Sequence, residues 1–264
     1  GHGSPDNALT DHLLHVAILS VKMGKELGWE VARLHRLAVA SLLHDVGMCL
    51  VPQNLRHKKG FLTSSELAVL CRHSSYGYQL IKALGGGESE KMANVIRQEH
   101  EREDGSGYPH GLSGGDIDEI SKVIAVSDVY EALTSDRPHR AGVLPNQAIK
   151  EMIDVRQHKF SPRVLKAMLN QISMFPLGSL VVLNTGVIAR VIEVHENLPM
   201  HPTVQFIHGP DEEDGRVLSL RENPHIHIRD CVNEADLDKL QYALKRERAA
   251  GRYFVSSRTR WRRK

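Results

Sequence analysis

The most constraining feature of this sequence is the pair His44-Asp45, which follows a long apolar run and is separated by Val46 alone from Gly47. Adjacent side chains on a helix point about 100° apart, so both can face one metal centre only where the helix ends. Other imidazole and carboxylate side chains recur at intervals of about one helix: His15, His73, Glu99, His100 and Asp128. One candidate ligand per helical segment is how a helical bundle assembles a metal site. The pattern therefore predicts a mainly α protein built around a metal centre.

Helical periodicity continues through most of the chain before Ile172. Apolar residues recur at helical spacing over 6–27 and over 31–44, and the second run becomes wholly apolar near its end. An imidazole buried beside a carboxylate needs a partner. Thr63 and Glu66 have the spacing of a capping box, which starts a helix expected to carry His73. Further helices are expected to end at Glu99-His100, to span 117–133 around Asp128, and to cover 146–153 and 161–172.

Residues 104–111 form a loop between two of these helices. Gly105, Gly107, Pro109 and Gly111 fall within this short stretch, and such a composition demands turns. A glycine-rich loop placed directly after a candidate ligand pair is suited to serve a site as well as to connect helices. We therefore expect the loop to belong to the metal centre.

The periodicity changes to that of strands beyond Gly178. Residues 179–183 and 187–194 predict a hairpin, and 203–207 and 217–220 add strands. A charged helix is expected from about 233 to 250, before a basic tail. The sequence thus predicts the following segments: a tag remnant at 1–4, a helical domain at 5–172, a small antiparallel β module at 173–229, and a C-terminal helix with a basic tail at 230–264.

The amino-acid composition limits the classes of protein to which this chain can belong. The chain is 41% hydrophobic and 25% charged, as in ordinary globular proteins, and no stretch approaches the ~18 apolar residues of a membrane helix. No signal peptide precedes the first helix. Cys49, Cys71 and Cys231 lack a CxxC spacing, and this pattern favours reduced thiols in a cytoplasmic protein. The net charge of +2 conceals a strongly basic segment at 245–264. The remainder is mildly acidic, so only the tail keeps a nucleic-acid or lipid role open.

These motifs together resemble the HD-GYP family, a branch of the HD phosphohydrolase superfamily. The resemblance covers about 6–172, and its most specific parts are the runs 101–109 and 128–138; the β module resembles an extension of some members. It implies an HD-type helical bundle that hydrolyses cyclic di-GMP to linear pGpG, with a further step to GMP left open, in bacterial second-messenger signalling. It also implies two or three divalent ions, iron or manganese, with nickel, zinc and magnesium as alternatives in vitro. Mixed imidazole and carboxylate ligands suit such ions independently of the resemblance.

The resemblance implies a role for each candidate residue. Asp45 and Asp128 would bridge or anchor the metals, while His44, His73 and His100 complete their coordination. His44 and Asp45 would thereby hold the metal-activated bridging water that attacks phosphorus. A third ion would be held by Asp11 and His15, which share one helix face, although the same pair is also compatible with a solvated surface. The positions that contact the nucleotide are Tyr108, Arg137 and Arg140.

Two residues depart from the family pattern. Glu99 stands where members usually have a histidine, which should alter metal preference without abolishing binding. Met48 stands where members have a lysine near the substrate phosphates, so turnover would be slow, depend on Lys58, Lys59 or another cation, or be absent. The leading prediction is a cyclic di-GMP phosphodiesterase. The alternatives are a receptor that binds the nucleotide and signals through a partner, and a hydrolase of another cyclic dinucleotide. An upstream regulatory region and a homodimer are further expected partners.

Overall fold

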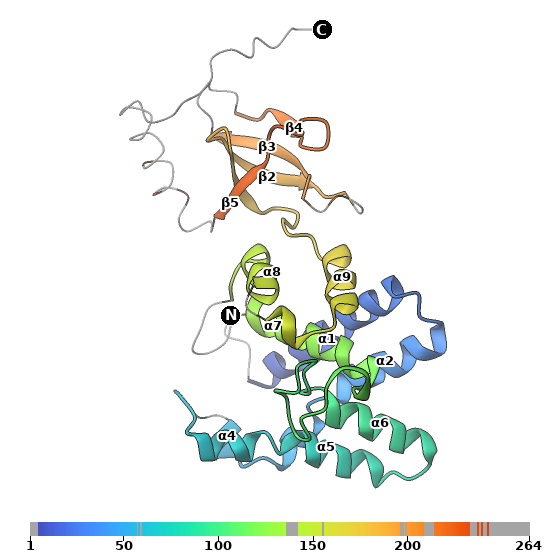
Figure 1. Cartoon of the computed structure of the whole chain (residues 1–264). Helices are drawn as coiled ribbons and strands as arrows, with labels where there is room; N and C mark the ends of the chain where they lie inside the picture. Colours follow the sequence, from blue (N-terminus) through green and yellow to red (C-terminus); the bar gives the residue numbers. More distant parts are fainter. Residues whose placement is uncertain are drawn as a thin grey trace. The chain divides into compact units, whose positions relative to one another are not determined.

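The computed structural model describes residues 5–56, 58, 60–135, 142–154, 156–195, 198, 200–208, 214–232, 237, 239 and 242. The chain divides into two compact units. One comprises Gly1–Val143 and Gln147–Gln171, and the other comprises Leu144–Asn146 and Ile172–Lys264. The first unit is helical and the second contains an antiparallel sheet (Figure 1), which confirms the predicted fold class.

The helical unit begins with a hairpin of two helices, α1 (Pro5–Glu26) and α2 (Val31–Leu43), close to the predicted ranges. Gly28 makes the turn with φ +76°, a left-handed conformation that favours glycine. Gly24 allows the helices to approach closely, because a Cβ there would lie 2.7 Å from a methyl group of Leu34. The two helices are consequently packed closely against each other.

The rest of the unit consists of α7 (Glu119–Thr134) and a series of shorter helices. These are η1 (Val46–Leu50), α3 (Gln53–Arg56), α4 (Ser64–Leu70), α5 (His73–Lys82), α6 (Gly87–Gln98), η2 (Gly114–Asp116), α8 (Pro145–Asp154), η3 (Gln157–Lys159) and α9 (Pro162–Gln171). Helix α7 contacts α1, α2, α6 and α9, and most of its side chains are buried. The Ser20 hydroxyl on α1 donates a 2.8 Å hydrogen bond to Ser127 on α7, one residue before Asp128. This contact places Asp128 at the interface between the two helices.

The segment around His73 differs from the prediction. The expected capping box of Thr63 and Glu66 is present, but the helix that it starts ends at Leu70, and His73 begins the next helix. The amide of Cys71 donates to the carbonyl of Leu67 (2.9 Å) and the amide of Arg72 donates to that of Val69 (3.2 Å), so the chain tightens into a turn there. The turn redirects the chain just before His73.

The second unit contains a five-stranded antiparallel sheet with the strand order β4-β3-β2-β1-β5. Its strands are β1 (Leu180–Leu183), β2 (Ile188–Glu193), β3 (Thr203–His208), β4 (Val217–Ser219) and β5 (Ile228–Val232). The sequence did not predict β5, which pairs with β1 and lies partly in the segment assigned to the C-terminal helix. Both oxygen and nitrogen of the Asn184 side chain bond the backbone just before β5, at His227 and His225. Apart from 237, 239 and 242, which are helical, the expected helix and basic tail lie outside the described residues.

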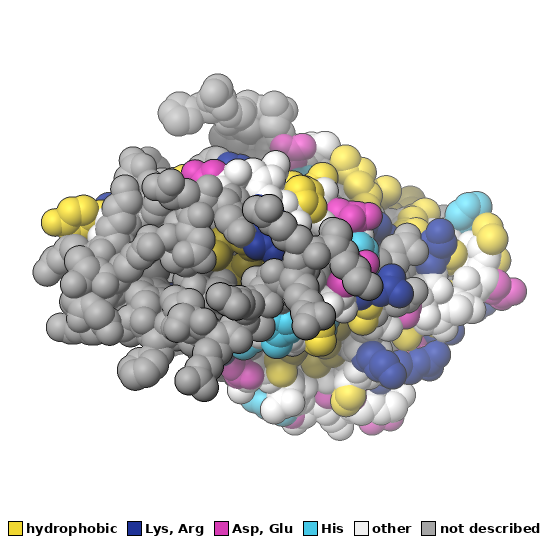
Figure 2. All heavy atoms as spheres, turned by 90° about the horizontal axis from the view of Figure 1, so that it is seen from above, with side chains coloured by type: hydrophobic (Ala, Val, Ile, Leu, Met, Phe, Trp, Pro, Cys, Tyr) yellow, Lys and Arg dark blue, Asp and Glu magenta, His cyan; other side chains and the backbone are white. Residues whose placement is uncertain are grey.

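The described surface carries both hydrophobic and charged side chains. Among the described helices, none combines the length and the apolar content that a membrane-spanning helix requires. Figure 2 shows hydrophobic side chains interspersed with charged ones on the described part of one face. The exposed large apolar residues include Leu14 and Ile18, which lie four residues apart on α1. Exposed apolar side chains are ordinary on the surface of a folded protein.

Candidate metal centre

His44 and Asp45 lie where α2 ends, as the sequence predicted. His44 keeps helical angles (φ −55°, ψ −39°), whereas Asp45 departs from them (φ −93°, ψ 10°). Gly47 then packs directly against the start of α5, where a Cβ would lie only 1.9 Å from the carbonyl oxygen of His73. The glycine therefore brings the backbone of the His-Asp pair into contact with the backbone that carries His73.

The first group of potential ligands consists of Asp45, His73, Glu99 and His100, whose donor atoms all lie within 4.8 Å of one another. His73 Nε2 lies 3.5 Å from Asp45 Oδ1, 3.3 Å from Glu99 Oε1 and 2.9 Å from His100 Nε2. The side chains come from the end of α2, the start of α5 and the end of α6. Segments far apart in the sequence thus present two imidazoles and two carboxylates to one point.

The second group consists of His12, His44 and Asp128, with donor atoms within the same limit of 4.8 Å. His12 Nε2 on α1 lies 3.5 Å from Asp128 Oδ1 on α7. Asp45 joins the two groups, because its Oδ2 lies 3.7 Å from His44 Nε2 and 4.0 Å from His12 Nε2, while its Oδ1 faces His73. The geometry is that of two neighbouring sites with one shared carboxylate.

Hydrogen bonds fix the orientation of three histidine rings. Nδ1 of His44 donates to the carbonyl oxygen of Ser41 (2.7 Å), and Nδ1 of His73 donates to that of Leu70 (2.8 Å). Nδ1 of His12 pairs with the carboxylate of Glu131. A proton on Nδ1 leaves the lone pair on Nε2, which is how metal-binding histidines are commonly oriented by their neighbours. In each case Nε2 is the atom that faces the carboxylates of the two groups.

The burial of these groups leaves two polar atoms without partners. His44 Nε2 and Glu99 Oε2 are buried, and neither has a hydrogen-bond partner within the described ranges. Such atoms are costly unless something satisfies them. A cation between them would satisfy both, and imidazole with carboxylate suits divalent iron, manganese or zinc. The residues present therefore fit the divalent ions that the sequence predicts.

The protein groups also perturb one another's protonation. Burial raises the pKa of Glu99 well above its usual range, although His44 opposes this shift, and burial lowers the pKa of His100 well below its usual range. Burial also lowers the pKa of His44, but the nearby carboxylates more than offset it, so that this pKa is raised. The pKa of His12 is raised for the same balance of reasons, chiefly its bond to Glu131. A concentration of perturbed groups in one place is typical of a functional site.

The glycine-rich loop closes over the first group. Gly107 packs against the backbone of His100, where a Cβ would lie 2.4 Å from the carbonyl oxygen. The next residue, Tyr108, donates its amide hydrogen to that oxygen and stacks its ring on the His100 ring, with centroids 4.7 Å apart. The carboxylate of buried Glu101 accepts hydrogen bonds from the amides of His110 (2.7 Å) and Leu112 (3.0 Å). The loop is thereby attached to the segment that carries two of the ligands.

The structure brings together most, but not all, of the predicted site residues. His44, Asp45, His73, Glu99, His100 and Asp128 belong to the two groups. His15 and Asp11 lie outside both: the His15 side chain is 60% exposed, 3.9 Å from Glu131, and Asp11 is exposed. Arg137 and Arg140 lie outside the described residues. A third ion at His15 and Asp11 therefore stays a prediction, as do the nucleotide contacts of the two arginines.

Neither His12 nor its partner Glu131 is among the site residues predicted from the sequence. His12 precedes buried Val16 by four residues and buried Met23 by eleven, so helical periodicity places it on the inner face of α1. His15 falls on the exposed side of the same helix. The periodicity of α1 was therefore the signal that could have selected His12 over His15.

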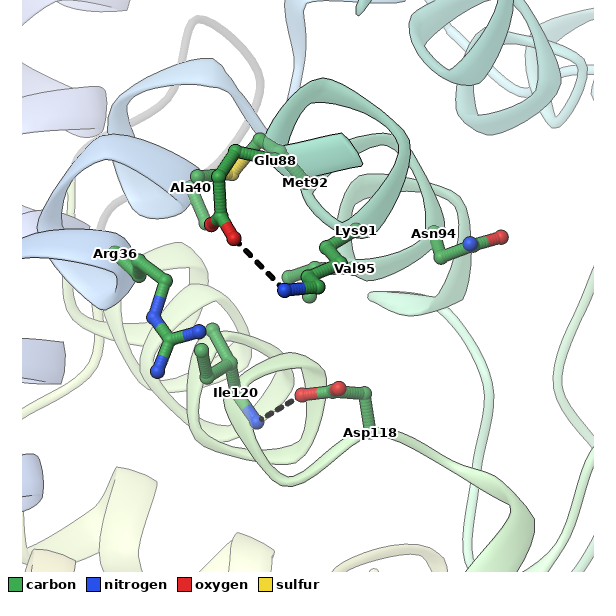
Figure 3. Close-up of a pocket in the computed structure, with 9 residues that line it drawn as sticks. All are labelled: Arg36, Ala40, Glu88, Lys91, Met92, Asn94, Val95, Asp118 and Ile120. Carbon is green, nitrogen blue, oxygen red and sulfur yellow. Dashed lines mark hydrogen bonds and ion pairs between the residues drawn. The ribbon is translucent and has the colours of Figure 1, made fainter. Parts of the chain in front are cut away.

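A separate pocket of about 220 Å³ lies between α2, α6 and α7 (Figure 3). Glu88 and Lys91, both on α6, form a 2.8 Å ion pair at its edge, and Asp118 caps α7 by accepting from the amide of Ile120 (2.8 Å). None of the residues that line this pocket belongs to either ligand group. We therefore assign it no part in the metal centre.

Two family models match parts of this chain. The model of a family described as "HD domain" matches residues 5–164, and a model described as "KOW domain associated with HD domain" matches residues 180–240. In the solved structures, a "HDG"Y"P protein" from Bdellovibrio bacteriovorus, Bd1817, superposes with a TM-score of 0.51 at 22% identity, covering 62% of this chain and 52% of that one. This likeness supports the fold.

Three curated relatives share parts of the sequence. The cyclic di-GMP phosphodiesterase PA4108 of Pseudomonas aeruginosa is 33% identical over 194 residues, which cover 74% of this chain and 46% of the relative. The cyclic di-GMP phosphodiesterase PdeB of Borreliella burgdorferi is 29% identical over 243 residues (88% and 62%). The 3'3'-cGAMP-specific phosphodiesterase 1 of Vibrio cholerae is 35% identical over 150 residues (57% and 33%). The chain thus spans between 33% and 62% of the length of these relatives.

Proposed function

This chain belongs to the HD domain family, as its resemblance to the HD-GYP branch implied, and we propose that it is a metal-dependent phosphodiesterase of cyclic di-GMP. The observation that carries the proposal is the pair of adjoining ligand groups that share Asp45. Two divalent ions a few Å apart suit the displacement of an oxygen at phosphorus. The names of the relatives from Pseudomonas and Borreliella support cyclic di-GMP as the substrate.

The ligand groups would hold the ions, with His73, His100 and Glu99 on one side and His12, His44 and Asp128 on the other. When bound, the ions supply Lewis acidity that lowers the pKa of a water nucleophile and neutralises charge on the phosphodiester. Glu131 would keep the His12 ring aimed at the second group.

Substrate recognition is assigned to the loop that carries Tyr108 and to the two arginines of the family pattern. Tyr108 is half-buried and stacked on His100, so its ring lies directly beside the first ligand group. Guanidinium groups at Arg137 and Arg140 would each donate two hydrogen bonds to phosphate or to guanine edges.

We place the reaction in a reducing compartment such as the cytoplasm, because Cys49, Cys71 and Cys231 are all free thiols.

The proposal is tested with protein that has been stripped of metal and reloaded with Mn²⁺ or Fe²⁺. We expect linear pGpG to accumulate from cyclic di-GMP and expect His44→Ala and Asp45→Ala to abolish its formation. His35→Ala is the matched control, because His35 is an exposed histidine on the same helix and should leave turnover unchanged. A parallel assay with 3'3'-cGAMP and a phosphate monoester determines the substrate class. Intact cyclic di-GMP after incubation with the loaded protein would refute the catalytic proposal.

Met48 favours a second function, a receptor that binds the nucleotide without cleaving it. A methionine cannot neutralise phosphate charge, and Lys58, which could substitute for the family lysine, places Nζ 2.6 and 2.7 Å from the two oxygens of Glu66. Lys59 lies outside the described residues. The receptor function predicts that calorimetry detects binding of cyclic di-GMP to the loaded protein while chromatography detects no product.

A further inference from the structure

Glu99 occupies an unusual place between the two ligand groups. It follows the last residue of α6, and its side chain is 1% exposed. One oxygen, Oε1, lies 3.3 Å from Nε2 of His73 and 3.3 Å from Nε2 of His100, which are both in the first group. This oxygen is placed to serve the first group with the two histidines.

The other oxygen of Glu99 faces the second group. Oε2 lies 3.9 Å from Nε2 of His44, and these are the two buried atoms that have no hydrogen-bond partner among the described residues. Two ligand atoms that each bind one ion at about 2.1 Å are separated by at most about 4.2 Å. The separations from both Glu99 oxygens to the facing imidazole nitrogens fall within this limit.

We propose that Glu99 is a second bridging carboxylate, which spans both ligand groups alongside Asp45. The inference rests on the proposed metal-dependent function and deepens it by assigning a role to this residue. Asp45 divides its oxygens in the same way, with Oδ1 toward His73 and Oδ2 toward His44. A histidine at position 99 would present a single nitrogen to the centre, as the others do, and would serve one group alone. The bridge is therefore a property of glutamate at this position.

Two consequences follow from a second bridge. With its Oε1 engaged in the first group, the Glu99 carboxylate would be held with Oε2 oriented toward the second group, and binding at the two groups would then be cooperative. An additional anionic oxygen in both sites also favours hard ions such as manganese over softer ones. Both consequences concern metal binding and are measurable in the absence of any nucleotide.

The test is a Mn²⁺ titration of the metal-stripped full chain by calorimetry, accompanied by electron paramagnetic resonance of the loaded protein. Glu99→His keeps a ligand for the first group but removes the bridge. We expect it to bind its first ion nearly as wild type does and its second about 10–100-fold more weakly, the range found when support of a metal site is lost. His12→Ala identifies the binding step that belongs to the second group. Glu103→Gln is the matched control, because Glu103 is a nearby glutamate whose carboxylate pairs with Lys122 (3.1 Å).

The outcomes separate this proposal from the phosphodiesterase proposal. If Glu99→His leaves the affinity of the second step and the coupling between the two Mn²⁺ spins unchanged, the bridge is refuted, whether or not the protein hydrolyses cyclic di-GMP. A cooperative wild-type isotherm that becomes sequential in Glu99→His supports it, even in a protein without turnover. Glu99→Gln serves as the second variant. It replaces the buried carboxyl group with an uncharged amide of the same shape, so the apo protein should fold, and the rise in Tm on adding Mn²⁺ should be smaller than for wild type.

Discussion

A methyl group at Gly47 would collide with the backbone that carries His73. The added Cβ would lie 1.9 Å from the carbonyl oxygen of His73 and 2.4 Å from the amide nitrogen of Gly77. Both neighbours are backbone atoms of α5, so neither can rotate away as a side chain would. Ordinary contact begins at 3.4 Å, so the chain at Gly47 must retreat from α5 by about 1.5 Å.

This retreat carries Asp45 away from the first ligand group. Asp45 lies two residues before Gly47, and its Oδ1 is 3.5 Å from His73 Nε2. A displacement of about 1.5 Å along this line gives about 5 Å, beyond the limit of about 4.2 Å for two atoms that bind one ion. We therefore expect Gly47→Ala to weaken Mn²⁺ binding by about 10–100-fold, and phosphodiesterase activity to fall with it. Overpacking should also cost about 1–3 kcal/mol of unfolding free energy.

The assay for Gly47→Ala is calorimetric Mn²⁺ titration together with thermal unfolding followed by circular dichroism. For a domain of this size, each kcal/mol lowers Tm by about 2–4 °C. Gly87→Ala is the matched control, because Gly87 begins α6 and a Cβ there meets no atom within 4 Å. That substitution should leave metal affinity unchanged. Wild-type affinity and Tm in Gly47→Ala would show that the contact between η1 and α5 does not position the centre.

Three further predictions concern other residues of the centre. His12→Ala should remove one of the two bound ions, as measured by elemental analysis, because His12 belongs to the second ligand group. His15→Ala should retain both ions, because His15 is exposed. Loss of an ion in His15→Ala but not in His12→Ala would make His15 the ligand in place of His12. Glu101→Gln should destabilise the loop by about 1.5–3 kcal/mol, because it weakens two hydrogen bonds to a charged group, and should raise KM for the nucleotide more than it lowers kcat. Met48→Lys should increase turnover of cyclic di-GMP at unchanged metal content, and an unaltered rate would remove Met48 as the cause of any weak activity.

The sequence by itself determined the fold class and the identity of most candidate ligands. Apolar periodicity decides which helices form, because each must bury one face, and the short-range signals at Thr63-Glu66 and at Gly105–Gly111 decide where helices begin and loops occur. The His44-Asp45 pair could be recognised because the reason for its position, the end of an apolar helix, is local.

Only the tertiary structure decided how those ligands are shared. His12 and His15 both lie on α1, and the choice between them depends on which face packs near α7 and Glu131. The strand β5 forms because its backbone pairs with that of β1, a contact between segments distant in sequence. The same holds for Glu99, whose two oxygens face different groups only because the end of α2, the start of α5 and the end of α6 meet at one point. Local sequence specifies donors and helices, whereas the spacing between donors on different helices is set by packing.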